Sequence, residues 1–175
     1  MFARLNADPV VMEHFPSPLT RLESDTFADR IEDHFETNGF GPWAVEARDE
    51  ADFIGYVGLL VPNFEAHFTP AVEVGWRLAR AYWGRGLATE AARAAVVDGF
   101  GRLGLSEIVS FTSPRNVRSI RVMERLGMIR NPLDDFDHPR LPDGHPLRRH
   151  VLYRLGRDAW LATGSQVAHS DQRRL

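Results

Sequence analysis

The chain has 175 residues, 43% of them hydrophobic, and a formal net charge of −3 at pH 7. This size fits one domain with a sizeable core, and no run of about 18 apolar residues offers a membrane span. The absence of cysteine excludes disulfides, thiolate nucleophiles and cysteine-bound zinc. The N-terminus lacks the pattern of a signal peptide, so we expect a soluble, cytoplasmic protein without a membrane partner.

Lysine is also absent, because all 21 basic residues are arginines. A Schiff-base lysine and the lysine of a GxxxxGK[ST] phosphate loop are therefore excluded, and the GxSxG hydrolase motif is missing. The charge is uneven: residues 1–76 carry 4 Arg and 14 Asp or Glu, whereas residues 77–130 carry 10 Arg and 4 acids. The basic middle favours a multiply anionic ligand, although solvated helix faces also produce such segments.

The first part of the chain predicts two helices. Asp8 as a cap and Pro9 at the first helical position predict a short helix that stops at Pro16. A second helix is expected from about Ser24 to Asn38, since apolar residues recur along one of its faces.

A hairpin and a loop are expected next. The segments Trp43–Arg48 and Phe53–Val61 alternate in polarity and are joined by four turn-forming residues. Glycines at 55 and 58 indicate a bulge or a close approach of another backbone. Pro62–Pro70 is predicted to be a loop.

The central stretch predicts a strand, a glycine turn and a helix in direct succession. The strand is Val72–Ala79, and it places Glu73 and Arg77 on the same face. The helix follows Gly86 and runs to about Arg102. A strand that enters a glycine turn and then a helix presents free backbone N–H groups, which is how proteins commonly bind phosphate.

The remaining elements are a strand over Glu107–Thr112, a helix over Val117–Leu126 and a final strand over Arg149–Leu155. Met128 and Ile129 begin a further strand, and Asn131–Pro146 is expected to be a long ordered loop without regular structure. Residues 1–163 thus form a single α/β (or α+β) domain around one mixed sheet. Residues 164–175 are predicted to be a polar, disordered tail.

Two sequence motifs lie about thirty residues apart in this region, EVGWRLARAYWGRGLATEA and, after it, NVRSIRVMERLGM. Together they resemble the GNAT superfamily of acyl-CoA-dependent N-acetyltransferases, in particular the branch of the ribosomal-protein N-terminal acetyltransferases. The resemblance covers about Phe40 to Leu126. It implies a central sheet that splays between Val72–Ala79 and Glu107–Thr112, with acetyl-CoA as co-substrate in the gap and no metal.

The resemblance also implies a set of cofactor-binding residues. The backbone of Leu78, Ala79 and Arg80 would pair with the pantetheine amides. An N–H group of Arg77 or Leu78 would polarise the thioester carbonyl. The pyrophosphate would be held by the amides of the glycine turn and the helix start, which are Gly84, Arg85, Gly86, Leu87, Ala88 and Thr89. The glycines allow backbone to approach oxygen, and the helix dipole favours the anion.

The second motif contributes Asn116 and Ser119. Asn116 would bind the cofactor or support the site through its amide. Ser119 would protonate the leaving thiolate or hydrogen-bond to it, and the alternative is a hydroxyl that satisfies backbone at the helix start. The side chains of Arg118, Arg121 and Arg125 are candidates for phosphate contacts.

Two departures from the family pattern are visible. Position 81, where the family places Gln or Arg, is Ala81. Members usually begin with a strand before the first helix, whereas this chain starts almost inside that helix. Either the first strand is missing, a neighbouring chain covers the gap, or the start site was misassigned. An uncovered sheet edge favours pairing with another chain, and a homodimer is one expected outcome.

For the chemistry, Glu73 is the carboxylate candidate for a general base, since its strand leads into the cofactor site. The alternatives are that Glu73 orders the strand or pairs with an arginine, and that a histidine (His138 or His145) or a water accepts the proton. The spacing of His138, His145 and His150 fits no standard metal site.

The acceptor pocket should involve the first two helices, the loop Pro62–Pro70 and the loop Asn131–Arg149. The acidic N-terminal part suggests a cationic amine, such as a protein N-terminus or a polyamine. We expect an N-acetyltransferase acting on a primary amine through a ternary complex, with another acyl-CoA donor as a variant. A catalytically silent acyl-CoA sensor or partner-binding module is the alternative. Nucleic-acid binding is not expected, because no recognition motif accompanies the arginines.

Overall fold

The computed structural model describes residues 1–162, so the predicted polar tail lies outside the described residues. The helices are α1 (Phe2–Ala7), α2 (Arg21–Asn38), α3 (Leu87–Gly101) and α4 (Val117–Arg125), with the short 3-10 helices η1 (Arg80–Tyr82) and η2 (Pro132–Asp134). Residues 157–162 are also helical. The strands are β1 (Pro42–Ala47), β2 (Ala51–Leu60), β3 (Glu73–Leu78), β4 (Glu107–Thr112), β5 (Ile129–Arg130), β6 (Phe136–Asp137) and β7 (Arg149–Gly156).

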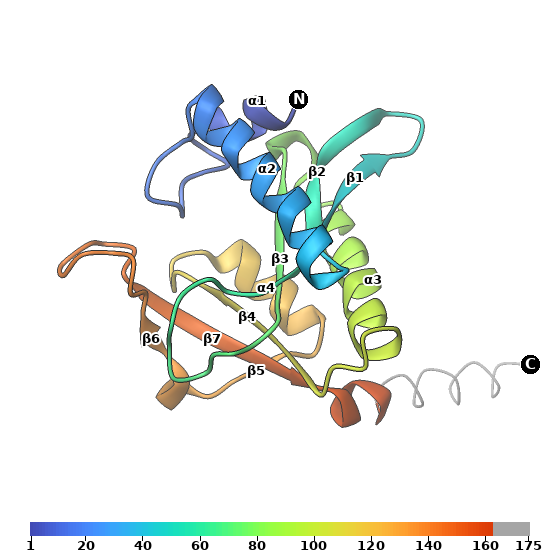
Figure 1. Cartoon of the computed structure of the whole chain (residues 1–175), viewed down its shortest axis with the longest axis vertical. Coiled ribbons are helices and arrows are strands. Elements are labelled where there is room, and N and C mark those ends of the chain that lie inside the picture. Colours follow the sequence, from blue (N-terminus) through green and yellow to red (C-terminus); the bar gives the residue numbers. More distant parts are fainter. Residues whose placement is uncertain (163–175) are drawn as a thin grey trace, which may run out of the picture.

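The strands form one mixed sheet in the order β1-β2-β3-β4-β7-β5, with β6 paired to β7. Among the strand pairs within residues 1–162, only the β3–β4 contact is parallel, and its register consists of a single pair, Glu73 with Val109. Beyond that pair the two strands diverge, so that β1–β3 and β4–β7–β5 form two halves joined near the start of β3 (Figure 1). The expected mixed sheet with a splayed centre is therefore confirmed.

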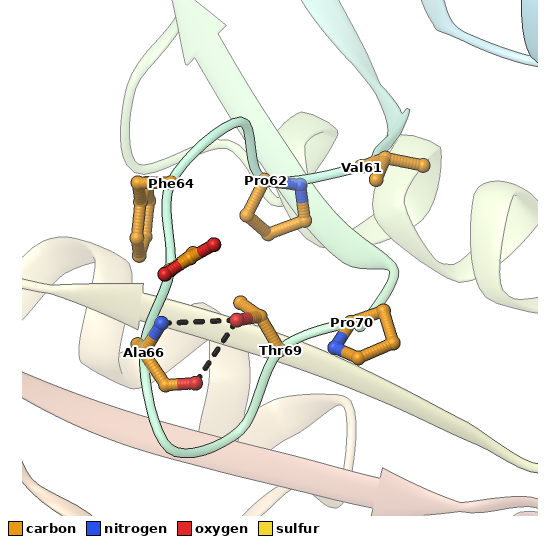
Figure 2. Close-up of a pocket in the computed structure, with 7 residues that line it drawn as sticks. Val61, Pro62, Phe64, Ala66, Thr69 and Pro70 are labelled. Atoms are coloured by element: carbon orange, nitrogen blue, oxygen red, sulfur yellow. Dashed lines mark hydrogen bonds between the residues drawn. The ribbon is translucent and has the colours of Figure 1, made fainter.

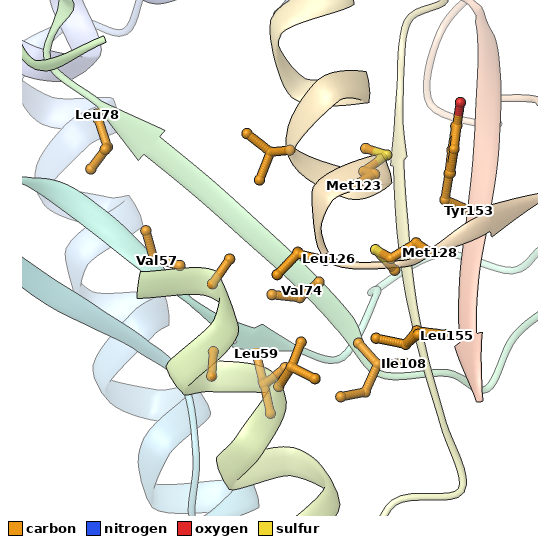
Figure 3. Packing of buried hydrophobic residues seen from close by; sticks show 14 of the residues in the cluster. Val57, Leu59, Val74, Leu78, Ile108, Met123, Leu126, Met128, Tyr153 and Leu155 are labelled. Atoms are coloured by element: carbon orange, nitrogen blue, oxygen red, sulfur yellow. The ribbon is translucent and has the colours of Figure 1, made fainter. Parts of the chain in front are cut away.

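The main core lies between the sheet and the helices α3 and α4. Val74 and Leu78 of β3 belong there to one buried cluster with Val96 of α3 and Met123 of α4. Figure 3 shows Val74, Leu78 and Met123 within this cluster. Because side chains alternate along a strand, Glu73, Gly75 and Arg77 face the opposite side. On that side α1 and α2 cover the sheet, and Phe2 and Phe27 pack near Tyr56 of β2.

Both N-terminal helices begin at other residues than the sequence predicts. Helix α1 precedes Asp8 instead of following it. The Asp8 carboxylate accepts from the Val10 N–H (2.8 Å), and its carbonyl accepts from Met12, so the residue builds a single turn. Helix α2 begins at Arg21, because Thr20 and Glu23 form a reciprocal capping box that starts the helix before Ser24. Its end at Gly39, in the left-handed conformation, agrees with the prediction.

The segment Asn131–Pro146 contains more regular structure than predicted. It includes η2 and the strand β6, whose Phe136 pairs with His150 of β7. The expectation of a loop without regular elements was wrong because a two-residue strand leaves almost no periodic signal. In contrast, the hairpin β1–β2 and the elements from β3 to α4 lie where the sequence predicts them, within about two residues.

Both glycines of β2 lie under another backbone. A Cβ on Gly55 would lie 2.1 Å from the Arg77 carbonyl oxygen, and one on Gly58 would lie 2.5 Å from the Gly41 carbonyl oxygen. The expected close approach is confirmed at both positions. Within residues 1–162 no strand precedes α1, and β1 forms one edge of the sheet.

Candidate active site

A cavity of about 1080 Å³ occupies the place where the sheet opens. Its walls come from the α1–α2 connection, one side of α2, β3, the turn before α3, the end of β4 and helix α4. The loop after β2 and the segment between β6 and β7 complete it, through residues such as Phe64 and His138. The segments predicted to surround the acceptor and those predicted to hold the cofactor thus line one cavity.

The register of β3 decides which backbone groups face the opening. Tyr56 and Arg77 are directly paired, and the Ala79 N–H donates to the Ile54 carbonyl (2.8 Å). Since N–H and C=O groups alternate in direction along a strand, those of Arg77 and Ala79 face β2, whereas those of Trp76 and Leu78 face the gap. The expected cofactor contacts of the Arg77 and Ala79 backbone do not fit this register, whereas the backbone groups of Trp76 face the gap.

The rest of this strand is partly engaged within the protein. The Leu78 carbonyl accepts from the Trp83 side-chain Nε1–H (2.7 Å), and the Arg80 carbonyl accepts from the Trp83 backbone N–H. The Leu78 N–H keeps its direction toward the gap. Neither Ala79 nor Arg80 lines the cavity.

The turn before α3 has the conformation that phosphate binding requires. Gly84 and Gly86 have φ angles of 75° and 84°, and Gly86 caps α3 without any side-chain hydrogen bond to the first turn. The first intrahelical bond joins the Glu90 N–H to the Gly86 carbonyl. The N–H groups of Leu87, Ala88 and Thr89 therefore have no helical acceptor, and all three residues line the cavity. Such an uncapped helix start fits a pyrophosphate.

The side chain of Arg85 points away from this site. Its guanidinium donates to the Glu50 carboxylate (2.8 Å) on the β1–β2 turn, and Arg85 does not line the cavity. This pair lies at the surface and contributes little to stability. Arg85 can therefore contribute to the turn only through its backbone.

Helix α4 brings Ser119 opposite Trp76 across the opening. The Asn116 side chain caps the helix by accepting from the Ser119 N–H (3.2 Å), and its amide donates to Thr112 (3.0 Å). Asn116 thus supports the site, and the Ser119 hydroxyl is not the helix cap. That hydroxyl accepts from the Trp76 indole N–H (3.2 Å), which leaves its own proton available to a further partner. Arg118, Arg121 and Arg125 line the same cavity.

Glu73 lies at the start of β3, in the cavity wall. Burial raises the pKa of its carboxyl to about 8. Among residues 1–162, Glu73 takes part in no ion pair, so the predicted alternative of an arginine partner does not apply to this part of the chain. A carboxyl with this pKa ionises at mildly alkaline pH, where it can accept a proton.

The three histidines of the C-terminal part are not equivalent. His138 and His150 line the cavity with ring centroids 5.1 Å apart, whereas His145 does not line it. Burial, followed by the neighbouring His150 and Arg140, lowers the pKa of His138 to about 4. No group of three or more metal-binding side chains is present in the described part of the chain.

The loop between β2 and β3 forms the wall beside these histidines. Its turn is closed by Thr69, whose hydroxyl accepts from the Ala66 N–H and donates to the Ala66 carbonyl, both at 2.9 Å (Figure 2). The ring of Phe64 lies 4.6 Å from that of His138 and lines the large cavity. The loop therefore adds an aromatic surface to the site.

Sequence reasoning missed the buried contact of Arg77 with the N-terminal helices. The Arg77 guanidinium donates to Asn6 Oδ1 (2.6 Å), and the Asn6 amide donates to Ser24 Oγ (2.9 Å). This network joins β3, α1 and α2. No spacing rule connects these three positions, because they come from separate elements, and only the packing of the helices on the sheet brings them together.

Comparison with known proteins agrees with this geometry. Residues 1–129 match the family model described as "Acetyltransferase (GNAT) domain". The chain is also 32% identical over 167 residues to an FsC-acetyl coenzyme A-N(2)-transacetylase from Aspergillus fumigatus, covering 90% of this chain and 69% of that protein. The chain belongs to the GNAT family and is an acetyl-CoA-dependent acyltransferase.

Solved structures share the fold. An acetyltransferase from Agrobacterium tumefaciens is similar with a TM-score of 0.68 and 26% identity, covering 88% of this chain and 82% of that one. A ribosomal-protein-S5-alanine acetyltransferase from Vibrio fischeri has a TM-score of 0.66 at 20% identity, covering 91% and 88%, which is a likeness of fold alone. Among the helices of residues 1–162, none is long and apolar enough to cross a membrane.

Proposed function

We propose that this protein transfers an acetyl group from acetyl-CoA directly to a primary amine, with both substrates bound together. The observation that carries the proposal is the opening between β3 and β4. It is bordered by the Trp76 backbone on one strand, Ser119 on α4 and the uncapped start of α3. A ligand that carries a thioester and, at some distance, a pyrophosphate fits such a site. The thioester would lie beside the β3 backbone and Ser119, and the pyrophosphate would meet the free N–H groups at the start of α3.

The donor would be held mainly by backbone. The amides at the start of α3 would bind the pyrophosphate, with Arg121 as a neighbouring cation that has no ion pair among the described residues. The gap-facing groups of Trp76 and Leu78 would pair with the pantetheine arm and polarise the thioester carbonyl. A fixed N–H donor at the developing oxyanion lowers the barrier because it needs no reorganisation during the reaction.

The acceptor would approach from the α1–α2 side, where Glu73 faces the cavity. Its neutral nitrogen attacks the carbonyl carbon, the new C–N bond forms, and the C–S bond breaks when the tetrahedral intermediate collapses. The proton lost by the amine passes to the Glu73 carboxylate, directly or through water. The CoA thiolate takes the hydroxyl proton of Ser119, and the proton that Glu73 took from the amine returns to the Ser119 oxygen through water, so both side chains regain their starting forms.

Glu73 is a better candidate for the base than either histidine. The pKa of Glu73 is about 8, so its carboxylate, once formed, is a stronger base than the ring of His138. The pKa of His138 is about 4, so its ring is a weak base at neutral pH. His145 lies outside the cavity lining, and its Nδ1 accepts from the Leu147 N–H (3.1 Å). Brønsted behaviour favours the group whose pKa lies nearest the working pH.

The outer edge of β1 supports the expected homodimer, since an unpaired edge strand is a template for pairing with a second copy. A light-scattering mass of two chains would agree with this proposal. A monomer at all concentrations would contradict it.

The test of the enzymatic function is the release of free thiol from acetyl-CoA when an amine is added. Because the protein has no cysteine, a thiol reagent reports only the CoA that is released. The panel should contain ribosomal-protein N-terminal peptides, polyamines and single amino acids. Amine-dependent thiol release is the expected result. Tight acetyl-CoA binding without release by any amine would instead favour a silent sensor.

A further inference from the structure

The charge of the cavity wall does not match the acidic N-terminal part of the sequence. The only carboxylate among the lining residues is Glu73. The other N-terminal acids do not line it: Glu23 belongs to the capping box of α2, Glu50 pairs with Arg85, and Glu13 pairs with the lining residue Arg118. Six arginines line the cavity, namely Arg30, Arg77, Arg118, Arg121, Arg125 and Arg140. Those of α4 lie on the side of the donor, whereas Arg30, Arg77 and Arg140 lie on the side of the acceptor.

Arg77 is the most unusual of these residues. It is only 7% exposed, yet it forms no ion pair in the described part of the chain. Its guanidinium lies over the ring of Phe15 at 4.1 Å and near the ring of Tyr56 at 5.4 Å. A buried cation without a counter-ion is costly, and such a group in a cavity indicates a missing partner.

The hydrogen bonds of Arg77 show which of its atoms lack a partner. A guanidinium has five N–H donors in one plane. In the described residues its side chain makes one hydrogen bond, from Nη1 to Asn6, and Nε is buried with no partner. Aromatic rings cover its faces, so the unused donors lie at its edge. That edge is the part of arginine that binds a carboxylate in a bidentate manner.

The neighbouring wall is aromatic. Phe64, Phe111, His138 and His150 line the cavity and contact one another, with ring centroids between 4.6 and 6.4 Å apart. Burial lowers the pKa values of both histidines, so these rings are neutral at physiological pH. The surface suits an apolar or aromatic body and offers no carboxylate to a second amine.

From these contacts we infer that the acceptor is a monoamine with an apolar or aromatic body and a carboxylate, which the free edge of Arg77 binds. This inference rests on the proposed acetyl transfer. It predicts that a polyamine is a poor acceptor, because a second or third ammonium group would meet arginines and neutral rings. It also reverses the expectation of a cationic acceptor that the acidic N-terminal part suggested.

The first test measures binding without turnover, by calorimetry in saturating CoA. The probes are the N-acetyl derivatives of phenylalanine, tryptophan and leucine, each as the free acid and as the amide. We expect at least one acid to bind about ten-fold or more tightly than its amide, since a charge-assisted pair is lost in the amide. Equal affinities, or no binding of any acid at millimolar concentration, would overturn the inference.

The variants then assign the preference to Arg77. Arg77→Met should abolish the difference between acid and amide, and Arg77→Lys should retain part of it, because lysine keeps the charge but not the planar fork. Arg21→Gln is the matched control: it removes an exposed cation of α2 that pairs with Asp25 outside the cavity lining, and it should leave the difference unchanged. A preference that persists in Arg77→Met would contradict the assignment. If neither variant folds, the preference of the unmodified protein decides.

The second test separates this inference from the proposed function. Thiol release is compared for L-phenylalanine, L-phenylalaninamide and spermidine as acceptors. Faster release with the acid supports both proposals. Faster release with spermidine keeps acetyl transfer and overturns the carboxylate site. Acid-selective binding without thiol release from any amine keeps the carboxylate site and overturns the proposed transfer.

Discussion

At the scale of single residues, the chemistry depends on how the fold alters ordinary groups. Glu73 is an example, because burial raises its carboxyl pKa from 4.5 to about 8. Below pH 8 the free enzyme therefore holds this group mostly protonated, and it cannot accept a proton. We expect kcat/KM to rise with pH and to level off above about 8, and Glu73→Gln to lower it by about 100-fold or more. The acceptor amine also loses a proton in this pH range. The pH profiles of the unmodified enzyme and of Glu73→Gln are therefore measured with the same acceptor, so that its titration affects both equally. An unchanged profile in the variant would assign the base elsewhere.

The same shift affects stability with a defined sign. The folded protein retains the Glu73 proton between pH 4.5 and about 8, whereas the unfolded chain loses it. The contribution of this group to stability is therefore present below pH 4.5 and is lost as the pH rises toward 8. We compare the melting temperature of Glu73→Gln with that of the unmodified protein at each pH. The variant's melting temperature minus that of the unmodified protein should be larger at pH 9 than at pH 5. A melting difference that does not vary with pH would contradict the raised pKa.

Ser119 is the other residue whose role can be tested directly. Its hydroxyl accepts from Trp76 Nε1, so its proton can be donated toward the gap. Ser119→Ala should lower kcat by about 100-fold if the hydroxyl protonates the thiolate, with little change in the KM for acetyl-CoA. Trp76→Phe is the control, because it removes the indole donor and keeps the hydroxyl. Full kcat in Ser119→Ala would exclude the catalytic role.

At the scale of elements, the contact between β2 and β3 sets the position of β3, which carries Glu73, Trp76 and Arg77. Gly55 has a φ of 149° and lies directly under the Arg77 carbonyl. Gly55→Ala would place a Cβ 2.1 Å from that oxygen, so β3 must move or the pair must separate. We expect a loss of about 3 kcal/mol or more in the free energy of unfolding, measured with urea. Gly101→Ala in α3, where a Cβ meets nothing within 4 Å, should be neutral or slightly stabilising. Equal effects of the two substitutions would contradict this account.

At the scale of the whole molecule, the sheet consists of two halves that share few contacts at the β3–β4 junction. A donor that lies in the opening touches both halves and binds only the folded protein. At 100 times its Kd, acetyl-CoA should stabilise the fold by about 2.7 kcal/mol. For a domain of this size, that corresponds to a rise of about 5–10 °C in the melting temperature. Acetyl-pantetheine, which lacks the nucleotide and the pyrophosphate, should give a much smaller rise at the same concentration. Equal rises would show that the start of α3 does not bind the pyrophosphate.

The sequence by itself determined the donor side of this protein. The strand, the glycine turn and the start of α3 are contiguous in the chain, so their backbone geometry follows from local propensities and from the glycines at 84 and 86. The helix that starts at Val117 and the position of Glu73 on β3 were accessible for the same reason.

Only the tertiary structure decided the acceptor side and the identity of the gap-facing groups. Arg77 and Trp76 are adjacent in sequence. Because of the pairing register with β2, the backbone N–H and C=O groups of Arg77 face β2, whereas those of Trp76 face the opening. The unpaired edge of Arg77 depends on Phe15 and Asn6, which reach it from separate segments. The net charge counted along the chain differs in sign from the charge of the residues that line this pocket, because among the N-terminal carboxylates only Glu73 is one of those residues. Long-range packing, which leaves no periodic signal in the sequence, decides these features.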